Sequence, residues 1–242
     1  MLYFLIKLMA ITAIRTFFNK ISAENVDYIA KDTPIIFTAN HPNTMMDPMI
    51  IGYTCKRKLH FFAKSTLFNN LIAGWFLRRI QIVPVYRKVD DPSKMDQNKE
   101  TFSKGYEILK QNKAFLIFPE GISTGDRKLS QIKTGAARIG FGAEAENDWQ
   151  LGVQIIPVGL NYANAIKFRS DVSTRFGQPI QLTDFRDVYE QNEKEAVHLV
   201  TEQIETALSK LTINLKGLEM QEIVEALERI YKQELAVDLG LE

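Results

Sequence analysis

Short apolar runs, bounded by polar or turn-forming residues, recur along the first three quarters of the chain. Four of them are rich in β-branched and aromatic side chains, at residues 35–39, 59–63, 114–118 and 153–160. Runs of that length without polar alternation predict strands that are buried on both faces. Two shorter runs, at residues 82–86 and 173–176, are expected to widen the same sheet.

Helical periodicity fills the gaps between these runs, at residues 67–79, 94–111 and 134–145. Alternating strands and helices predict an α/β fold with a mixed, largely parallel central sheet flanked by helices. From residue 187 onward the apolar positions keep helical spacing, with a second segment at residues 218–235. The pattern therefore predicts three parts: a lead-in at 1–29, an α/β domain at 30–186 and a C-terminal helical extension at 187–242.

The lead-in begins with an amphipathic helix. Lys7 and Arg15 interrupt its apolar residues, so no run approaches the roughly 20 residues that span a bilayer, and no signal-peptide pattern follows. Lys7, Arg15 and Asn19 fall on one side, opposite Ile14 and Phe17. Such a helix either packs on the domain's own core or lies in a membrane interface. We favour the interface, and expect a peripheral protein on the cytoplasmic face of a membrane.

Composition narrows the possible partners and cofactors. With 242 residues, 45% of them hydrophobic, the chain can bury one sizeable core. A formal net charge of +1 argues against a nucleic-acid binder. The single cysteine, Cys55, cannot form an intramolecular disulfide, and no Cys/His cluster has the spacing of zinc ligands. We therefore expect no metal, and a reducing compartment.

The strand predicted at residues 35–39 runs into Asn-His-Pro-Asn-Thr-Met-Met-Asp-Pro, which contains His41 and Asp47. Open α/β sheets bind ligands at the carboxyl ends of their strands. Six positions along a continuous helix would turn Asp47 away from His41, so a contact between them requires a folded-back loop. In that loop Asp47 would orient His41 as a general base. Taken locally, Asp47 before Pro48 is also a typical helix N-cap.

Two further blocks carry candidate chemistry. Arg87 follows the predicted strand at residues 82–86 and offers the planar donor fork that suits a phosphate, although a solvated loop cation is an equal alternative. Phe118-Pro119-Glu120-Gly121 leaves another buried strand and places Glu120 and Gly121 beside the expected cleft. Its alternative is a turn or a helix cap.

In order along the chain, Asn-His…Asp, Pro-Val-x-Arg, Phe-Pro-Glu-Gly and Ile-Pro-Val resemble the four blocks of the glycerolipid acyltransferase superfamily, over roughly residues 30–185. The resemblance implies that His41 deprotonates an acceptor hydroxyl and that Asp47 orients it. It implies that Arg87, Glu120 and Gly121 bind a glycerol phosphate acceptor. It further implies acyl-coenzyme A or acyl-carrier-protein as donor, with no permanently bound cofactor.

The chain departs from the usual family pattern at two places. Five residues separate His41 from Asp47, where most members have four, so the acceptor is either glycerol-3-phosphate, its 1-acyl derivative or dihydroxyacetone phosphate. The third block lacks its usual Thr-Arg continuation, and Arg127 or Lys133 is the candidate to replace that charge.

Two rival functions remain open. Gly-Ile-Ser-Thr-Gly around Ser123 matches a hydrolase nucleophile elbow, and Asp171 or Asp184 followed by His198 gives the triad order, which would make a Ser hydrolase or thioesterase. Alternatively, the N-terminal helix and the apolar segment at residues 67–77 would serve a non-catalytic peripheral lipid-binding module.

Overall fold

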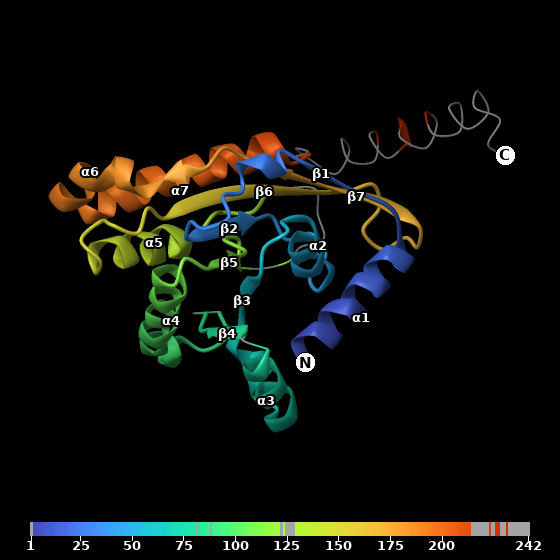
Figure 1. The fold of residues 1–242 in the computed structure, drawn as a ribbon, viewed down its shortest axis with the longest axis horizontal. Coiled ribbons are helices and arrows are strands. Elements are labelled where there is room, and N and C mark those ends of the chain that lie inside the picture. The colour runs from blue at the N-terminus through green and yellow to red at the C-terminus, as the bar shows by residue number, and fades with distance from the viewer. Residues whose placement is uncertain are drawn as a thin grey trace.

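The computed structural model describes residues 2–80, 82–87, 89–121, 123, 129–213, 223, 226–227 and 231. Its centre is an eight-stranded sheet in the order β1-β7-β6-β2-β5-β3-β4, with β8 paired to β6 (Figure 1). The strands are β1 (Phe18–Glu24), β2 (Ile35–Ala39), β3 (Leu59–Lys64), β4 (Ile82–Val85), β5 (Ala114–Ile117), β6 (Gln154–Tyr162), β7 (Ser170–Phe176) and β8 (Ile180–Gln181).

Five neighbouring strands, β6, β2, β5, β3 and β4, run parallel to one another. β7 and β8 are antiparallel to β6, and β1 is parallel to β7. The predicted mixed, largely parallel sheet flanked by helices is thereby confirmed.

Alternate residues of β2 pack into two different cores, which explains why the strand has no alternating exposed polar positions. Ile36 joins one cluster of buried side chains, whereas Ile35 and Phe37 join the other. Helices cover both clusters because a parallel sheet has no solvated face. The helices are α1 (Leu2–Phe17), α2 (Met46–Thr54), α3 (Leu71–Arg79), α4 (Asn98–Lys110), α5 (Gly135–Ala145), α6 (Arg186–Gln191) and α7 (Glu193–Leu211).

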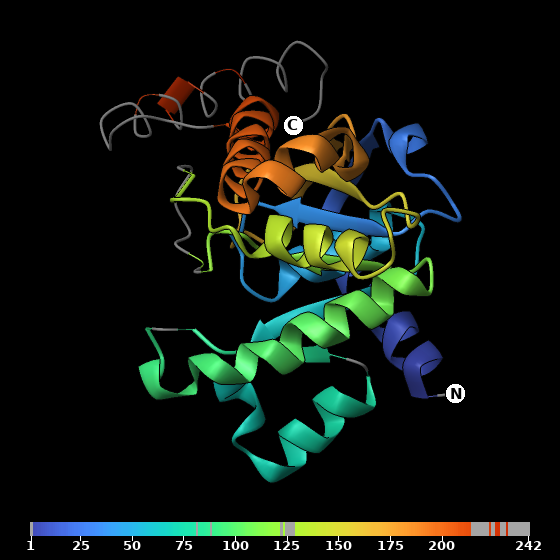
Figure 2. The same ribbon diagram turned by 90° about the vertical axis from the view of Figure 1, so that its left-hand side faces the viewer.

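The helices divide between the two faces of the sheet. Helices α4, α5 and α7 supply Ile108, Ile139 and Val200 to the cluster around Ile36, and Figure 2 shows these three helices side by side. On the other face, Ile14 of α1 joins the second cluster, as does Ile50 of α2. The inner side of α1 therefore packs on the protein's own core at Ile14.

Several element boundaries differ from the sequence prediction. The first helix ends at Phe17, and β1, which the sequence pattern did not predict, adds an edge strand beside β7. The helices predicted at 67–79 and 94–111 each begin with a separate 3-10 turn, at Ser65–Phe68 and Pro92–Gln97. The segment predicted at 218–235 lies mostly outside the described residues.

One further correction concerns Asp47. It is not the N-cap of α2, since that position belongs to Met45 and Asp47 lies inside the first turn. Pro48 fits there because the first-turn N–H groups have no partner within the helix.

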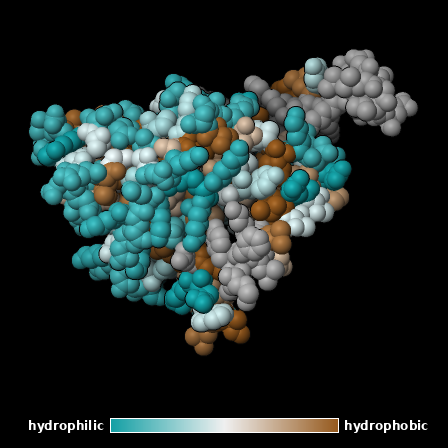
Figure 3. Space-filling view, in the orientation of Figure 1, coloured by the Kyte–Doolittle hydropathy of each residue, from teal (hydrophilic) through white to brown (hydrophobic). Residues whose placement is uncertain are grey.

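No helix in the described part of the chain is both long enough and apolar enough to cross a bilayer. Apolar side chains do gather on the surface of α3, where Leu71, Ile72 and Trp75 are 90%, 81% and 63% exposed. Figure 3 shows this apolar surface at the lower tip of the molecule. Asn70 begins the helix by accepting hydrogen bonds from the Ile72 and Ala73 backbone N–H groups.

Candidate active site

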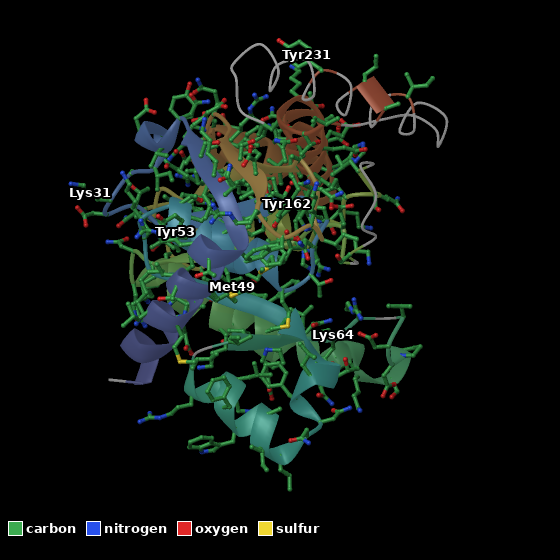
Figure 4. All side chains as sticks on the ribbon, turned by 90° about the vertical axis from the view of Figure 1, so that its right-hand side faces the viewer. Lys31, Met49, Tyr53, Lys64, Tyr162 and Tyr231 are labelled. Atoms are coloured by element: carbon green, nitrogen blue, oxygen red, sulfur yellow. The ribbon has the colours of Figure 1, made fainter. Side chains whose placement is uncertain are left out.

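The candidate site residues follow the carboxyl ends of the parallel strands. His41 follows β2, Glu120 follows β5 and Arg87 follows β4, while Lys64 is the last residue of β3 and Tyr162 the last of β6 (Figure 4 labels both). Strands that run the same way present these ends at one edge of the sheet, so residues far apart in sequence converge there.

His41 and Asp47 are in direct contact. His41 Nδ1 lies 2.8 Å from Asp47 Oδ2, with the imidazole 16% exposed and the carboxylate fully buried. Since a carboxylate only accepts, the Nδ1–H donates and Nε2 is left as the basic nitrogen. The folded-back loop that the sequence requires is therefore present, with Thr44 in it at a φ of 26°.

Asp47 has two further donors that hold it against His41. The Asn43 backbone N–H donates to the same oxygen, Oδ2, over 2.8 Å, and the Tyr162 hydroxyl donates to Oδ1 over 2.5 Å. Burial and the adjacent Asp47 carboxylate raise the pKa of Tyr162 well above its usual range, so this hydroxyl stays protonated. No motif in the sequence marks Tyr162; its place at the end of β6 is the one available signal.

Three sets of contacts hold the loop that carries His41 in place. Asn40 extends the β2–β6 pairing through its side chain, which donates to the Leu160 carbonyl and accepts from the Leu160 N–H. The His41 ring stacks on Phe118, with ring centroids 3.8 Å apart. Glu120 is buried, and its two oxygens accept the backbone N–H groups of His41 and Ser130. Glu120 thus ties two loops of the site together.

Arg87 lies near this loop and is already hydrogen bonded. Its Nη1 donates to the Gly121 carbonyl over 2.5 Å, while Nε and Nη2 donate to the two carboxylate oxygens of Asp90 over 2.6 and 2.7 Å. Gly121 has a φ of 71°, and a Cβ there would lie 2.7 Å from Lys133 Nζ. Glycine at position 121 therefore suits both the backbone conformation and the close approach of Lys133.

Lys133 thus lies beside Gly121, as the predicted replacement for the missing charge would require. Arg127, the other candidate, falls outside the described residues. Lys64, the last residue of β3, is an additional cation that no sequence motif marks. Among the described residues, no group of three or more His, Cys, Asp or Glu side chains is placed to hold a metal ion.

The hydrolase triad is not assembled in the described structure. β5 ends at Ile117, so no strand leads directly into Ser123, and the Ser123 Oγ accepts hydrogen bonds from Thr44. His198 is exposed on α7 and pairs with Glu202 of the same helix. Among the residues that the structure describes, the strand that should lead into a nucleophile elbow is therefore missing before Ser123.

The sequence of this chain is similar to sequences of known proteins. Residues 20–161 match the family model described as Acyltransferase, which includes His41, Asp47, Arg87 and Glu120. A relative from Saccharomyces cerevisiae, named glycerol-3-phosphate O-acyltransferase 2, is 31% identical over 136 residues, which cover 56% of this chain and 18% of the relative. One from Streptococcus pneumoniae, named 1-acyl-sn-glycerol-3-phosphate acyltransferase, is 28% identical and is matched over 77% of this chain and 64% of its own length.

The fold has a counterpart among solved structures. The crystal structure of the 1-acyl-sn-glycerophosphate (LPA) acyltransferase PlsC from Thermotoga maritima superposes with a TM-score of 0.58 at 21% identity, covering 86% of this chain and 79% of that one. The present chain spans less than two thirds of the length of either relative named above. The family match alone covers more than half of the chain, which therefore belongs to the acyltransferase family.

Proposed function

We propose that this chain transfers a fatty acyl group from acyl-coenzyme A or acyl-carrier-protein to a hydroxyl of a glycerol phosphate acceptor, as a step of phospholipid biosynthesis. The acceptor is glycerol-3-phosphate or its 1-acyl derivative. The observation that carries the proposal is the 2.8 Å contact between His41 and the buried Asp47, at the strand ends where Arg87 and Lys133 also lie. The names of the yeast and streptococcal relatives point to the same two acceptors.

In the proposed reaction His41 Nε2 removes the proton from the acceptor hydroxyl, and that oxygen attacks the thioester carbonyl. The new C–O bond forms, the C–S bond breaks, and the proton held by His41 passes to the leaving thiolate. Asp47 stabilises the imidazolium through Nδ1. Arg87 and Lys133 hold the acceptor's phosphate, since both are cations next to the Gly121 segment. No acyl-enzyme is needed.

We further propose that the protein works as a peripheral protein on the cytoplasmic face of a membrane, with α3 in the lipid interface. The exposed side chains of Leu71, Ile72 and Trp75 form an apolar stripe, and Arg78 and Arg79 follow it at the end of the helix. Cations beside an apolar stripe suit the anionic cytoplasmic leaflet.

The test is His41→Ala, assayed with vesicles, each of the two thioester donors and each of the two acceptors. We expect transfer to fall about 10²- to 10⁴-fold while vesicle binding is kept. His198→Ala is the matched control, because His198 is exposed on α7 and should leave transfer unchanged. The proposed enzyme would be refuted if His41→Ala kept full transfer, or if the wild type showed no transfer with any pair of substrates. Vesicle binding without any transfer would favour a lipid-binding module.

A further inference from the structure

The carboxylate of Asp90 occupies the side of Arg87 that is best suited to a phosphate. Its two oxygens accept hydrogen bonds from Nε and Nη2, the two parallel donors of the guanidinium fork. A phosphate would take the same pair of donors for bidentate binding. Nη1 is turned to the Gly121 carbonyl, so the fork is held in place from both sides.

Two more cations add positive charge near the same carboxylate. Lys64 is in register with Val85, two residues before Arg87, and Lys133 Nζ approaches Gly121. The hydrogen bonds from Arg87 are the largest cause that lowers the pKa of Asp90. Burial opposes them, and the positive charges of Arg87, Lys64 and Lys133 lower the pKa further. Three cations near one carboxylate give the site a net positive charge, which favours the binding of a second anion.

We propose that Asp90 is a built-in counter-ion of the phosphate-binding site, and that the acceptor's phosphate displaces it from Arg87. This counter-ion role rests on the proposed function in one respect: the proposed function identifies the ligand as a phosphate monoester. A dianionic phosphate brings more charge and more acceptor oxygens to Arg87, Lys64 and Lys133 than the Asp90 carboxylate does. Asp90 would then keep Arg87 oriented in the empty site and disfavour acceptors that lack a phosphate.

The test compares Asp90→Asn with Asp91→Asn. Asp91 is the matched control because it is the adjacent acid, yet it pairs with Lys94 and Ser93. Inorganic phosphate is titrated into each purified protein by calorimetry, and the KM for glycerol-3-phosphate is measured in parallel. We expect Asp90→Asn to lower the Kd for phosphate and the KM for the acceptor about three- to tenfold, and Asp91→Asn to change neither. Asp90→Glu, which keeps the charge, should bind phosphate as the wild type does.

An unchanged or weaker affinity in Asp90→Asn would overturn the proposal, because Asp90 would then only orient Arg87. The same holds if Asp91→Asn or Asp90→Glu gains as much affinity. If phosphate binding responds as expected while the wild type shows no acyl transfer, the anion site stands and the proposed function fails. If transfer occurs and phosphate affinity does not respond to Asp90→Asn, the counter-ion role alone fails.

Discussion

The hydroxyl of Tyr162 is the third donor to Asp47. Its replacement tests whether a residue outside the sequence motifs positions the proposed catalytic pair, His41 and Asp47. Tyr162→Phe leaves one oxygen of a buried carboxylate without this partner. We expect a loss of about 1.5–3 kcal/mol in the free energy of unfolding, the usual contribution of a hydrogen bond to a charged group. We also expect kcat to fall about tenfold, with a shifted pH profile, because Asp47 is freer to move away from His41.

Tyr28→Phe is the control for this change. The Tyr28 hydroxyl accepts a hydrogen bond from Gln178 at the surface, so its removal should alter stability by less than about 0.5 kcal/mol and leave kcat unchanged. Urea unfolding and transfer rates as a function of pH provide the two readouts. An unaltered pH profile in Tyr162→Phe would limit its role to stability.

At the residue scale, the sequence predicts contacts that are encoded by short motifs. The His41–Asp47 contact follows from a histidine and an aspartate that lie close together in the sequence after a buried strand, and it is present at 2.8 Å. Tyr162 and Lys64 lie more than 95 residues apart in sequence, each at the end of a different strand. Only the strand order brings them near this loop, and local sequence does not encode strand order. Arg87 and Asp90 are close in sequence, but two such charges are equally typical of a solvent-exposed loop. Their ion pair could therefore not be predicted from the sequence.

At the scale of elements, Asn40 joins two strands beyond the end of their backbone pairing. Asn40→Ala removes the two hydrogen bonds that the Asn40 side chain makes with the backbone of buried Leu160. We expect a loss of about 2 kcal/mol in the free energy of unfolding. Since His41 is the next residue, transfer per folded molecule should fall as well, by roughly tenfold.

Asn161 provides a matched control on the neighbouring position of β6. Its side chain donates to the Leu211 carbonyl and accepts from the Ile213 N–H, so it makes the same two kinds of hydrogen bond as Asn40. Asn161→Ala should lower stability while keeping the transfer rate of the folded protein. Equal loss of transfer in both variants would mean that Asn40 acts only through stability.

The elements themselves were predictable where burial dictates their sequence. β2, β3, β5 and β6 read as strands because the parallel sheet is covered on both faces. β1 was not predicted because it is an edge strand with mostly exposed positions and polar residues. The start of α3 after Asn70 is also not predicted by the sequence pattern. The helical spacing of apolar residues continues across Asn70, and only its side-chain cap separates the 3-10 turn from α3.

At the scale of the whole molecule, the apolar surface of α3 lies apart from the two cores. In Figure 1 and Figure 2 α3 forms the lowest part of the protein, and the N-terminal end of α1 points to the same side. Leu8 and Met9 of α1 are also exposed, so both helices present apolar side chains outward. A lipid surface on this side would bring an acyl acceptor near the loop that follows β3, because the connection from β3 to β4 contains α3.

This arrangement predicts that membrane affinity depends on α3. Leu71→Ser combined with Trp75→Ala should weaken binding to vesicles containing anionic lipid at least tenfold, since each large side chain contributes about 1.5–3 kcal/mol when fully buried. Because Arg78 and Arg79 add an electrostatic part, wild-type binding should also weaken as salt is raised. Vesicle sedimentation measures both effects.

Ile166→Ser is the control, since Ile166 is as exposed as Leu71 but lies in the loop between β6 and β7. If Ile166→Ser weakens binding as much as the α3 variant, the lipid surface lies elsewhere.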